Sequence, residues 1–332
     1  MNPLVSIIIP CYNEEATICL LLEALLQQTY PRARMEVVIA DGLSTDRTRE
    51  EVAAFQKEHP DLALLVVDNP QRIIPAGLNV ALASATGEIV VRLDAHCVPH
   101  PDYVTWCVSD LAQGLGDNVG GVWEIHPGGD GWIAQAIAIA AAHPLGVGDA
   151  LYRFATQASA VETVPFGAFY RALVAKVGPF DETLLTNEDY EFNARVRLAG
   201  GRIWLDPAIR SVYFARAKLS ALARQYWRYG YWKLRMLRRY PTTVRWRQAL
   251  PPLFVLSLLG LALLAPWWRL ARLGLAAEIA LYSLVLLVAG VQLAVRQKKP
   301  ALTIGVPIGI VTMHVAWGSG FIWSLLSSLM KL

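Results

Sequence analysis

Short apolar strands alternate with helical segments over the first 93 residues, and this alternation constrains the fold more than any other feature. The predicted strands cover residues 4–9, 35–40, 62–67 and 87–93. The predicted helices between them begin near residue 14 and cover residues 46–59 and 76–85. Two strands joined by a helix run parallel in one sheet, with the helix as the crossover. We therefore predict an α/β fold with a Rossmann-like, mostly parallel sheet.

The last part of the chain has a different composition, which predicts a membrane region. Apolar residues make up 55% of the 332 residues and charged residues 17%, and the apolar excess lies beyond about Gln248. A membrane-spanning helix needs about 20 residues, and three segments are close to that length or exceed it: 251–268, 276–295 and 301–330. We expect a globular domain over 1–230, a basic and aromatic interface segment over 231–250, and about three transmembrane helices over 251–332.

Basic residues beside the apolar segments predict the orientation in the membrane. They are dense before the first segment and after the second, and sparse between the first two. Cytoplasmic loops carry the excess of Lys and Arg, so we expect the globular domain in the cytoplasm. Residues 5–10 are too short for the apolar part of a signal peptide, and the four cysteines form no Cys-x-x-Cys pair, which indicates free thiols. The net charge of +3 gives no indication of nucleic-acid binding.

Two further elements are predicted between the globular motifs and the membrane region. An apolar helix over 132–140 is too short to span a bilayer and fits either a core helix or a helix that lies at the membrane interface. Residues 160–166 predict a strand that leads to the small residues at 167 and 168.

The strand at 87–93 ends beside two residues that can bind a cation. Asp94 and His96 lie two apart, and at strand spacing they point the same way, out of the carboxyl edge of the sheet. Open α/β sheets bind ligands at that edge, and a carboxylate with an imidazole can hold a divalent cation that holds a diphosphate. Taken alone, the pair is better explained as an Asp that caps a turn and a surface His, and the rest of the chain reverses that preference.

Four polar motifs follow predicted strands or begin a predicted helix. They are Pro10–Glu15, Asp41–Thr48, Asp94–His96 and Asn187–Asp189. In order, spacing and strand context they resemble the family 2 glycosyltransferases of the GT-A fold over roughly the first 230 residues. Within that family the chain is most similar to the membrane-bound transferases of bacterial exopolysaccharide assembly, the ExoA-like group of succinoglycan synthesis. The segments that carry this closer resemblance are Asn69–Arg72, Leu93–His96, Pro165–Arg171 and Gln225–Gly230.

The resemblance implies a role for each residue of the site. The residues expected to bind a nucleotide-diphosphate sugar, a UDP-sugar above all, are Pro10, Tyr12, Asn13, Glu14, Asp41, Arg72, Asp94, Gln225 and Arg228. Asp94 and His96 are expected to hold a metal; many members have a second Asp where this chain has His96, and we expect Mn²⁺ rather than Mg²⁺. Asp189 is implied as the catalytic base, with Glu188 beside it pointing elsewhere on the same turn. Glu191 is the rival for the base.

The resemblance implies an inverting hexosyltransferase in the bacterial inner membrane that acts in exopolysaccharide assembly. Its acceptor would be a hydroxyl of a saccharide linked to a polyprenyl diphosphate, among membrane lipids. Tyr229 replaces the Trp of the Gln-x-x-Arg-Trp motif of processive members, which favours the addition of one sugar. Two alternatives stay open: transfer to polyprenyl phosphate itself, which needs no base to activate a hydroxyl, and a non-catalytic membrane protein that binds a nucleotide sugar.

Overall fold

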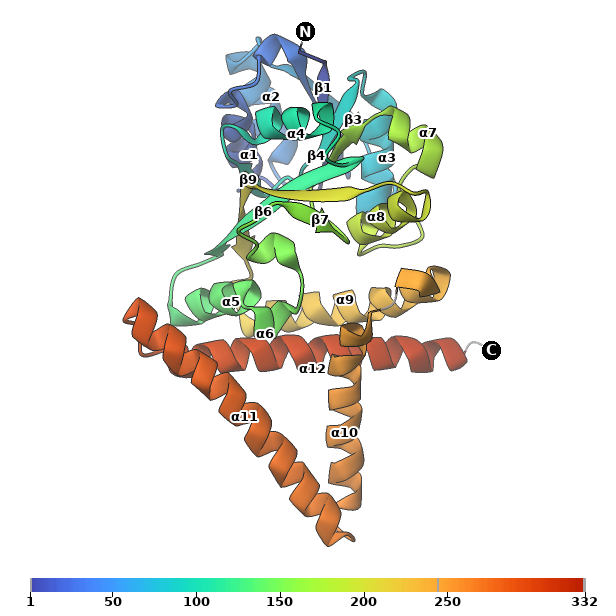
Figure 1. Cartoon of the computed structure of the whole chain (residues 1–332). Helices are drawn as coiled ribbons and strands as arrows, with labels where there is room; N and C mark the ends of the chain where they lie inside the picture. The colour runs from blue at the N-terminus through green and yellow to red at the C-terminus, as the bar shows by residue number, and fades with distance from the viewer. Residues whose placement is uncertain (1, 244, 331–332) are drawn as a thin grey trace. The chain divides into compact units, whose positions relative to one another are not determined.

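The computed structural model describes residues 2–243 and 245–330, which divide into two compact units (Figure 1). The first unit contains the chain up to Glu124 together with Leu151–Tyr213. The second contains Ile125–Ala150 and the chain from Phe214 onward.

The first unit is built on a mixed sheet whose first four strands are parallel. The strands of this part, in spatial order, are β3 (Ala63–Asp68), β2 (Met35–Asp41), β1 (Val5–Cys11) and β4 (Ile89–Arg92). The sheet continues through β8 (Ala168–Tyr170), β6 (Asn118–Pro127), β9 (Ile203–Ala215) and β5 (Cys97–Pro99), and β7 (Ser159–Val161) also pairs with β9. β8 runs antiparallel to β4. The predicted α/β fold with a Rossmann-like sheet is confirmed, but the sheet is mixed, because the strands beyond β4 add antiparallel pairs.

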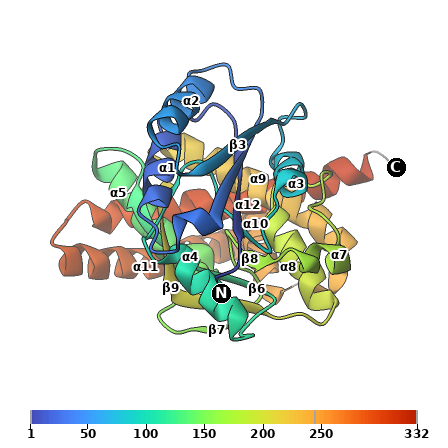
Figure 2. The same ribbon diagram turned by 90° about the horizontal axis from the view of Figure 1, so that it is seen from above.

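Helices cover both faces of this sheet, which explains why β1 is apolar without interruption (Figure 2). Ile7 and Ile9 point to one face, where they join a core with α1 (Ile18–Leu26), α2 (Thr48–Glu58) and α4 (Tyr103–Ala112). Ile8 points to the other face and joins a core with α3 (Ile74–Ser84), α7 (Ala172–Val177) and α8 (Glu188–Leu198). The strand order reverses direction between β1 and β4, and the loops after these two strands therefore flank the crevice in which such sheets bind ligands.

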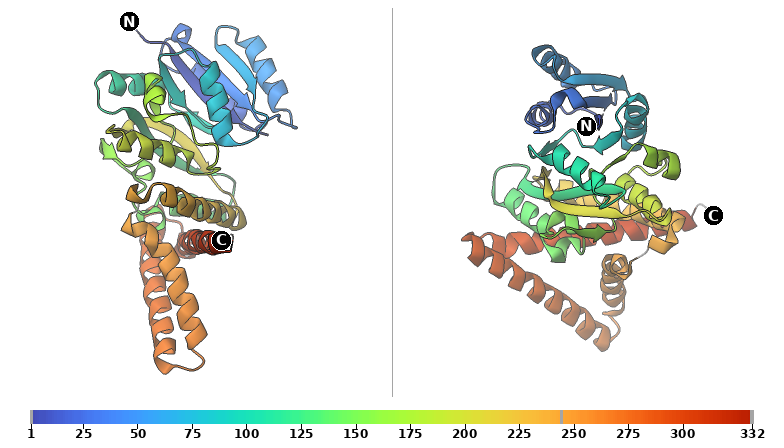
Figure 3. Two further views of the ribbon diagram at one scale, coloured as in Figure 1. Left: turned by 90° about the vertical axis from the view of Figure 1, so that its right-hand side faces the viewer. Right: turned by 45° about the horizontal axis from the view of Figure 1, so that its top comes forward.

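The second unit is helical. Its helices are α5 (Trp132–Ala142), α6 (Pro144–Val147), α9 (Leu219–Arg239), α10 (Leu250–Leu264), α11 (Arg269–Gln297) and α12 (Leu302–Leu329). α9 and α12 lie side by side, and α10 and α11 form a hairpin that extends away from them (Figures 1 and 3). Among the described residues, three helical segments are long and apolar enough to cross a membrane: Trp246–Leu264, Arg269–Gln297 and Leu302–Leu329.

The compact units differ in their bounds from the expected domains 1–230, 231–250 and 251–332. Helices α5 and α9 belong to the second unit, because their apolar faces pack against α12. The apolar helix predicted at 132–140 is present as α5 and is a packed helix of that unit. The strand predicted over 160–166 is wrong beyond Val161: β7 ends there, and Phe166 has a φ of 52°, which no strand residue adopts.

A buried pair of carboxyl groups below the sheet makes a pH-dependent contribution to stability. Asp110 of α4 is 2% exposed and shares a hydrogen bond with Asp206 of β9. Burial and this second carboxylate raise the pKa of Asp110 to about 6, from an ordinary value of 3.8. The folded state therefore holds the proton more tightly than the unfolded state, and stability falls as the pH rises through that window.

We expect Asp110→Asn to remove this pH dependence, because the amide keeps a donor for Asp206 and cannot ionise. As the pH rises from about 4 to about 7, the free energy of unfolding of the variant should increase relative to that of the wild type by up to about 3 kcal/mol. Thermal melts of both full-length proteins in detergent across this range would measure the difference. Melting curves that stay parallel over the whole range would contradict the assignment.

Candidate functional site

Hydrogen bonds join the loop after β1 to the loop after β2. The Asn13 backbone N–H donates to Ser44 Oγ at 2.9 Å, and the Thr45 backbone N–H donates to Asn13 Oδ1 at 2.8 Å. The Glu14 backbone N–H donates to Thr48 Oγ1 at 2.8 Å. Asn13 has a φ of 55°, a left-handed conformation that Asn tolerates better than most residues. The first two polar motifs therefore form one continuous polar edge at the carboxyl ends of their strands.

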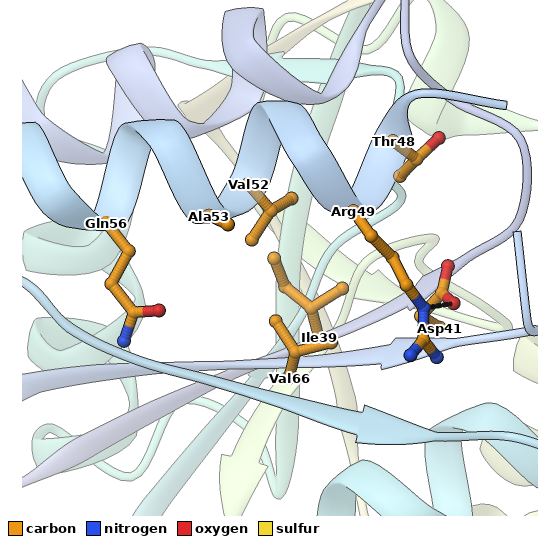
Figure 4. Close-up of a pocket in the computed structure, with 8 residues that line it drawn as sticks. All are labelled: Ile39, Asp41, Thr48, Arg49, Val52, Ala53, Gln56 and Val66. Atoms are coloured by element: carbon orange, nitrogen blue, oxygen red, sulfur yellow. Dashed lines mark hydrogen bonds and ion pairs between the residues drawn. The ribbon is translucent and has the colours of Figure 1, made fainter.

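Asp41 lies at the end of β2 beside a small pocket (Figure 4). The side chain is 2% exposed and accepts hydrogen bonds from the Ser44 backbone, from Ser44 Oγ at 2.5 Å and from Arg49 Nε at 2.5 Å. An ionised carboxylate offers about four acceptor positions, so one more donor can be accommodated. The pocket has a volume of about 210 Å³ between α2 and strands β2 and β3, with the Asp41–Arg49 pair at its polar end.

A buried arginine holds three carboxylates together at the end of β4. Arg92 is 3% exposed, and its Nη1 donates to Asp189 Oδ2 at 2.7 Å. Its Nη2 donates to Glu188 Oε1 at 3.1 Å and lies 2.8 Å from Asp94 Oδ1. The guanidinium also lies over the Phe166 ring, 5.1 Å from the centroid, which adds a cation–π contact. One cation faces three acids, so the cluster retains excess negative charge when all of them are ionised.

Burial changes the protonation of this cluster. The pKa of Asp189 is raised to about 8 by burial; Arg92 opposes the shift, and the neighbouring Glu188 and Asp94 add to it. Burial alone would lower the pKa of Arg92, but the three carboxylates raise it above its usual range, so the guanidinium stays charged. A carboxyl group with a pKa near neutrality is suited to general acid–base chemistry.

His96 and Asp94 have different partners, although they are two residues apart. His96 Nδ1 lies 3.1 Å from Glu14 Oε1, across the crevice between the ends of β1 and β4. Asp94 is bound to Arg92 through Oδ1, and its side chain is 21% exposed. Within residues 2–243 and 245–330, no three His, Cys, Asp or Glu side chains come close enough to hold a metal by themselves.

The residues nevertheless fit a divalent cation that is shared with a diphosphate. Mg²⁺ and similar ions are commonly bound through one or two carboxylates together with substrate phosphates. Asp94 is partly exposed at the strand end, and the excess negative charge around Arg92 favours a cation there. Asp94 is the residue that would hold such an ion, and His96 is a candidate second ligand.

The model of "Glycosyl transferase family 2" matches residues 6–178, which contain three of the four polar motifs and the strands that carry them. The chain belongs to glycosyl transferase family 2. It is therefore a glycosyltransferase, and the predicted family and enzyme class are confirmed.

Similar proteins span nearly the whole transferase. The "Succinoglycan biosynthesis protein ExoA" of Rhizobium meliloti (strain 1021) is 33% identical over 319 residues, which cover 95% of this chain and 93% of that protein. A Methanococcus voltae enzyme described as "Dolichyl N-acetyl-alpha-D-glucosaminyl phosphate 3-beta-D-2,3-diacetamido-2,3-dideoxy-beta-D-glucuronosyltransferase" is 26% identical and covers 97% of both chains. The mannosyltransferase PcManGT of Pyrobaculum calidifontis, solved with GDP-Man and Mn²⁺, has a TM-score of 0.60 at 24% identity over 94% of this chain and 87% of its own. This structural likeness supports the GT-A fold of the transferase.

The other predicted donor-binding residues lie in two places. Pro10 is the penultimate residue of β1, Tyr12 follows the strand with 43% exposure, and Arg72 is exposed in the loop after β3 with a φ of 56°. Gln225 and Arg228 belong to α9 in the second unit, where Gln225 Nε2 donates to Tyr229 Oη at 2.8 Å. Their roles in the transferase stay predictions.

The structure contradicts the expected orientation of Glu188 and bears on the choice between Asp189 and Glu191. Glu188 does not point away from Asp189, because both side chains contact Arg92. Glu191, the rival base, is fully buried and forms a two-point ion pair with Arg195, at 2.6 Å and 2.8 Å, so it has no access to an acceptor.

Arg92 and Arg49 are the residues of the site that motif reasoning missed. Arg92 interrupts the apolar run Ile89–Leu93, and a charged residue in a strand that is buried on both faces needs ionic partners. That signal is visible in the sequence. Arg49 carries no such signal, because an arginine in the first turns of a helix is ordinary.

Proposed function

We propose that this transferase moves a sugar, with inversion, from a nucleotide-diphosphate sugar to a hydroxyl group of a lipid-linked saccharide during the assembly of a cell-surface polysaccharide. The membrane-like helices of the second unit support a lipid-linked acceptor. The names of the two relatives also support it, since one acts in succinoglycan biosynthesis and the other on a dolichyl-linked sugar phosphate.

In this proposal the donor lies across the carboxyl ends of β2, β1 and β4. The nucleotide, a uridine in our proposal, contacts the joined loops at Asn13 and Asp41, with Tyr12 and Arg72 as exposed neighbours. Asp41 takes one further donor at its remaining acceptor position, and Arg49 fixes the orientation of that carboxylate.

The diphosphate lies at Asp94, which would hold the divalent cation with His96, and we favour Mn²⁺ there. When bound, the cation stabilises the negative charge of the leaving nucleoside diphosphate. Arg92 keeps Asp94 beside the base through the shared guanidinium. Arg228 of α9 is a further candidate for a contact to the diphosphate, because Arg binds phosphates in a bidentate manner.

Asp189 is the proposed base. The acceptor oxygen forms a bond to the anomeric carbon while the bond from that carbon to the diphosphate oxygen breaks, and the acceptor proton passes to Asp189. Arg92 binds Oδ2 of this carboxylate, which leaves Oδ1 as the oxygen that faces the acceptor. The observation that carries the proposal is that Arg92 contacts both Asp189 and Asp94, which supports a base next to the residue that would hold the diphosphate.

The test uses purified full-length protein in detergent with Mn²⁺ and a panel of UDP-, GDP- and dTDP-sugars, with and without a polyprenyl-diphosphate-linked saccharide. The measured quantity is the release of nucleoside diphosphate. Release from one donor that depends on the saccharide supports the proposal. If polyprenyl phosphate alone is enough for release, the proposal is wrong and the protein instead makes a lipid-phosphate sugar. Donor binding without release under every condition would favour a non-catalytic binding protein.

The pH dependence of the rate tests the base separately. Because the pKa of Asp189 is raised to about 8 and the base must be ionised, kcat/KM should rise as the pH increases through that value. Initial rates at fixed Mn²⁺ and limiting donor between about pH 6 and pH 9 would record the profile. A rate that is already at its plateau at the lowest pH would contradict the raised pKa.

A further inference from the structure

Helix α12 is packed differently from the other two long apolar helices of the second unit. Half of its most apolar stretch is buried against protein, compared with 11% for Trp246–Leu264 and 17% for Arg269–Gln297. The helices that contact it are α5, α9, α10 and α11. α10 and α11 instead expose their side chains over most of their length. Of these three helices, α12 is therefore the one that packs extensively against the other helices of the unit.

Glycines bring α12 into backbone contact with α9. A Cβ atom at Gly230 of α9 would lie 2.0 Å from the Trp317 carbonyl oxygen of α12. A Cβ atom at Gly320 of α12 would lie 2.2 Å from the Trp227 carbonyl oxygen of α9. Only glycine fits at these two positions, because any side chain would overlap the backbone of the other helix. α9 and α12 therefore lie at the same depth relative to a bilayer along this stretch.

The composition of α9 indicates that the two helices do not lie at the centre of a bilayer. The helix contains six basic residues and no acid: Arg224, Arg228, Lys233, Arg235, Arg238 and Arg239. Charged side chains at the bilayer centre are costly and rare, whereas basic and aromatic side chains are common at the interface. Arg224, Arg228, Arg238 and Arg239 are exposed. An in-plane helix beside anionic lipid headgroups satisfies them.

The uncovered side of α12 is a continuous apolar stripe. Ile304, Ile308, Val311, Val315, Trp323 and Leu326 are all more than one-third exposed and recur at helical spacing along one face. With 28 residues, α12 is about 42 Å long, so its apolar face can extend far along the surface of a leaflet. Its axis also runs across the direction of the α10–α11 hairpin (Figures 1 and 3).

We infer that α12 does not cross the membrane but lies in the plane of one leaflet, with its apolar stripe in the acyl region and α9 at headgroup level. The apolar stripe contacts the lipid of the same bilayer that the α10–α11 hairpin enters. The exposed Trp267 and Trp268 with Arg269 mark the tip of that hairpin at the opposite interface. The inference rests on the membrane attachment that the proposed function also uses.

The number of crossings after α9 is then two, so α12 ends on the side of the membrane from which α10 departs. Three crossings would place that end on the opposite side. The two topologies therefore place the end of α12 on opposite sides of the membrane, and this difference can be measured without an assay of activity.

The first test measures depth with nitroxide labels on Ile304→Cys, Val315→Cys and Leu326→Cys in the full-length protein, reconstituted in anionic lipid vesicles. The outer two positions are 22 residues apart, about 33 Å along the helix. We expect equal accessibility to oxygen and to a polar relaxing agent at all three positions. Labels at Leu273→Cys and Val291→Cys of α11 serve as a control that must differ in depth. A maximum of oxygen accessibility at Val315→Cys, with both outer labels in water, would overturn the inference.

The second test labels single cysteines with an impermeant maleimide in right-side-out and inside-out membrane vesicles. The variants are Met330→Cys at the end of α12, Ala265→Cys at the hairpin tip and Gln113→Cys after α4, in a Cys19→Ser background. Met330→Cys should react in the same vesicles as Gln113→Cys, and Ala265→Cys in the others. Reaction of Met330→Cys together with Ala265→Cys overturns the inference and leaves the proposed function intact. Protein that is removed from vesicles by carbonate would overturn both the inference and the lipid-linked acceptor.

Discussion

Replacing Asp189 by Asn is expected to lower kcat about 10³-fold, within the range of 10² to 10⁴ that a positioned base contributes. The amide has nearly the same shape as the carboxyl group, and its oxygen can still accept from Arg92 Nη1, so the fold should be retained. It cannot take the proton from the acceptor hydroxyl. The measurement is the rate of nucleoside diphosphate release at saturating donor and acceptor, with donor affinity measured separately by calorimetry.

Glu188→Gln is the matched control for this experiment. It removes one negative charge from the same guanidinium at a similar distance, but it leaves Asp189 in place. We expect this variant to lose less than about tenfold in kcat, because the proton acceptor remains. If Asp189→Asn kept rates close to those of Glu188→Gln, Asp189 would be a partner of Arg92 and not the base.

Arg92→Met should have the largest effect on stability of any substitution in the site. Removing one partner of a buried ion pair costs about 3–5 kcal/mol, because the remaining charge is left uncompensated. Here three carboxylates lose their shared cation, and the methionine side chain keeps most of the volume against Phe166. Thermal or denaturant unfolding of the full-length protein in detergent would measure the loss, which we expect to be accompanied by loss of transfer.

A double-mutant cycle separates charge from packing. If like-charge repulsion causes the instability, Arg92→Met combined with Glu188→Gln should be more stable than Arg92→Met alone, because one uncompensated acid is gone. Arg92→Lys keeps the positive charge but lacks the two nitrogens of the guanidinium group. In the native protein, one of them contacts Asp189 and the other contacts Glu188 and Asp94. We expect Arg92→Lys to recover part of the stability. Additive effects in the cycle would indicate that Arg92 acts through its packing on Phe166.

The local sequence predicted the part of the fold in which neighbours in sequence become neighbours in space. The parallel strands β1 to β4 follow from strand–helix alternation, because a crossover helix allows one arrangement. The antiparallel strands β5 to β9 are short or distant in sequence, and nothing in their local pattern specifies their order. Val161 and Phe166 illustrate this: residues 160–166 were predicted as one strand, but β7 ends at Val161 and Phe166 has a positive φ.

The site was predictable in its acids but not in its pairing. Asp41, Asp94 and Asp189 were found from strand ends and from a resemblance. His96 lies against Glu14 from another loop, 82 positions away in the chain, and no local pattern indicates that contact. Which partner a polar side chain takes is decided by tertiary geometry, and periodicity within one segment contains no information about it.

The hydrogen bonds between the loops at Asn13 and Ser44 have a thermodynamic consequence for donor capture. These bonds join the two loops in the absence of a ligand, so this half of the proposed donor site would lose little conformational entropy on binding. Donor association through these loops should therefore be close to lock-and-key, with a rate set by diffusion and charge. Thr48→Val, which removes the acceptor of the Glu14 backbone N–H and is not a proposed donor contact, should weaken nucleotide binding mainly through a less favourable entropy.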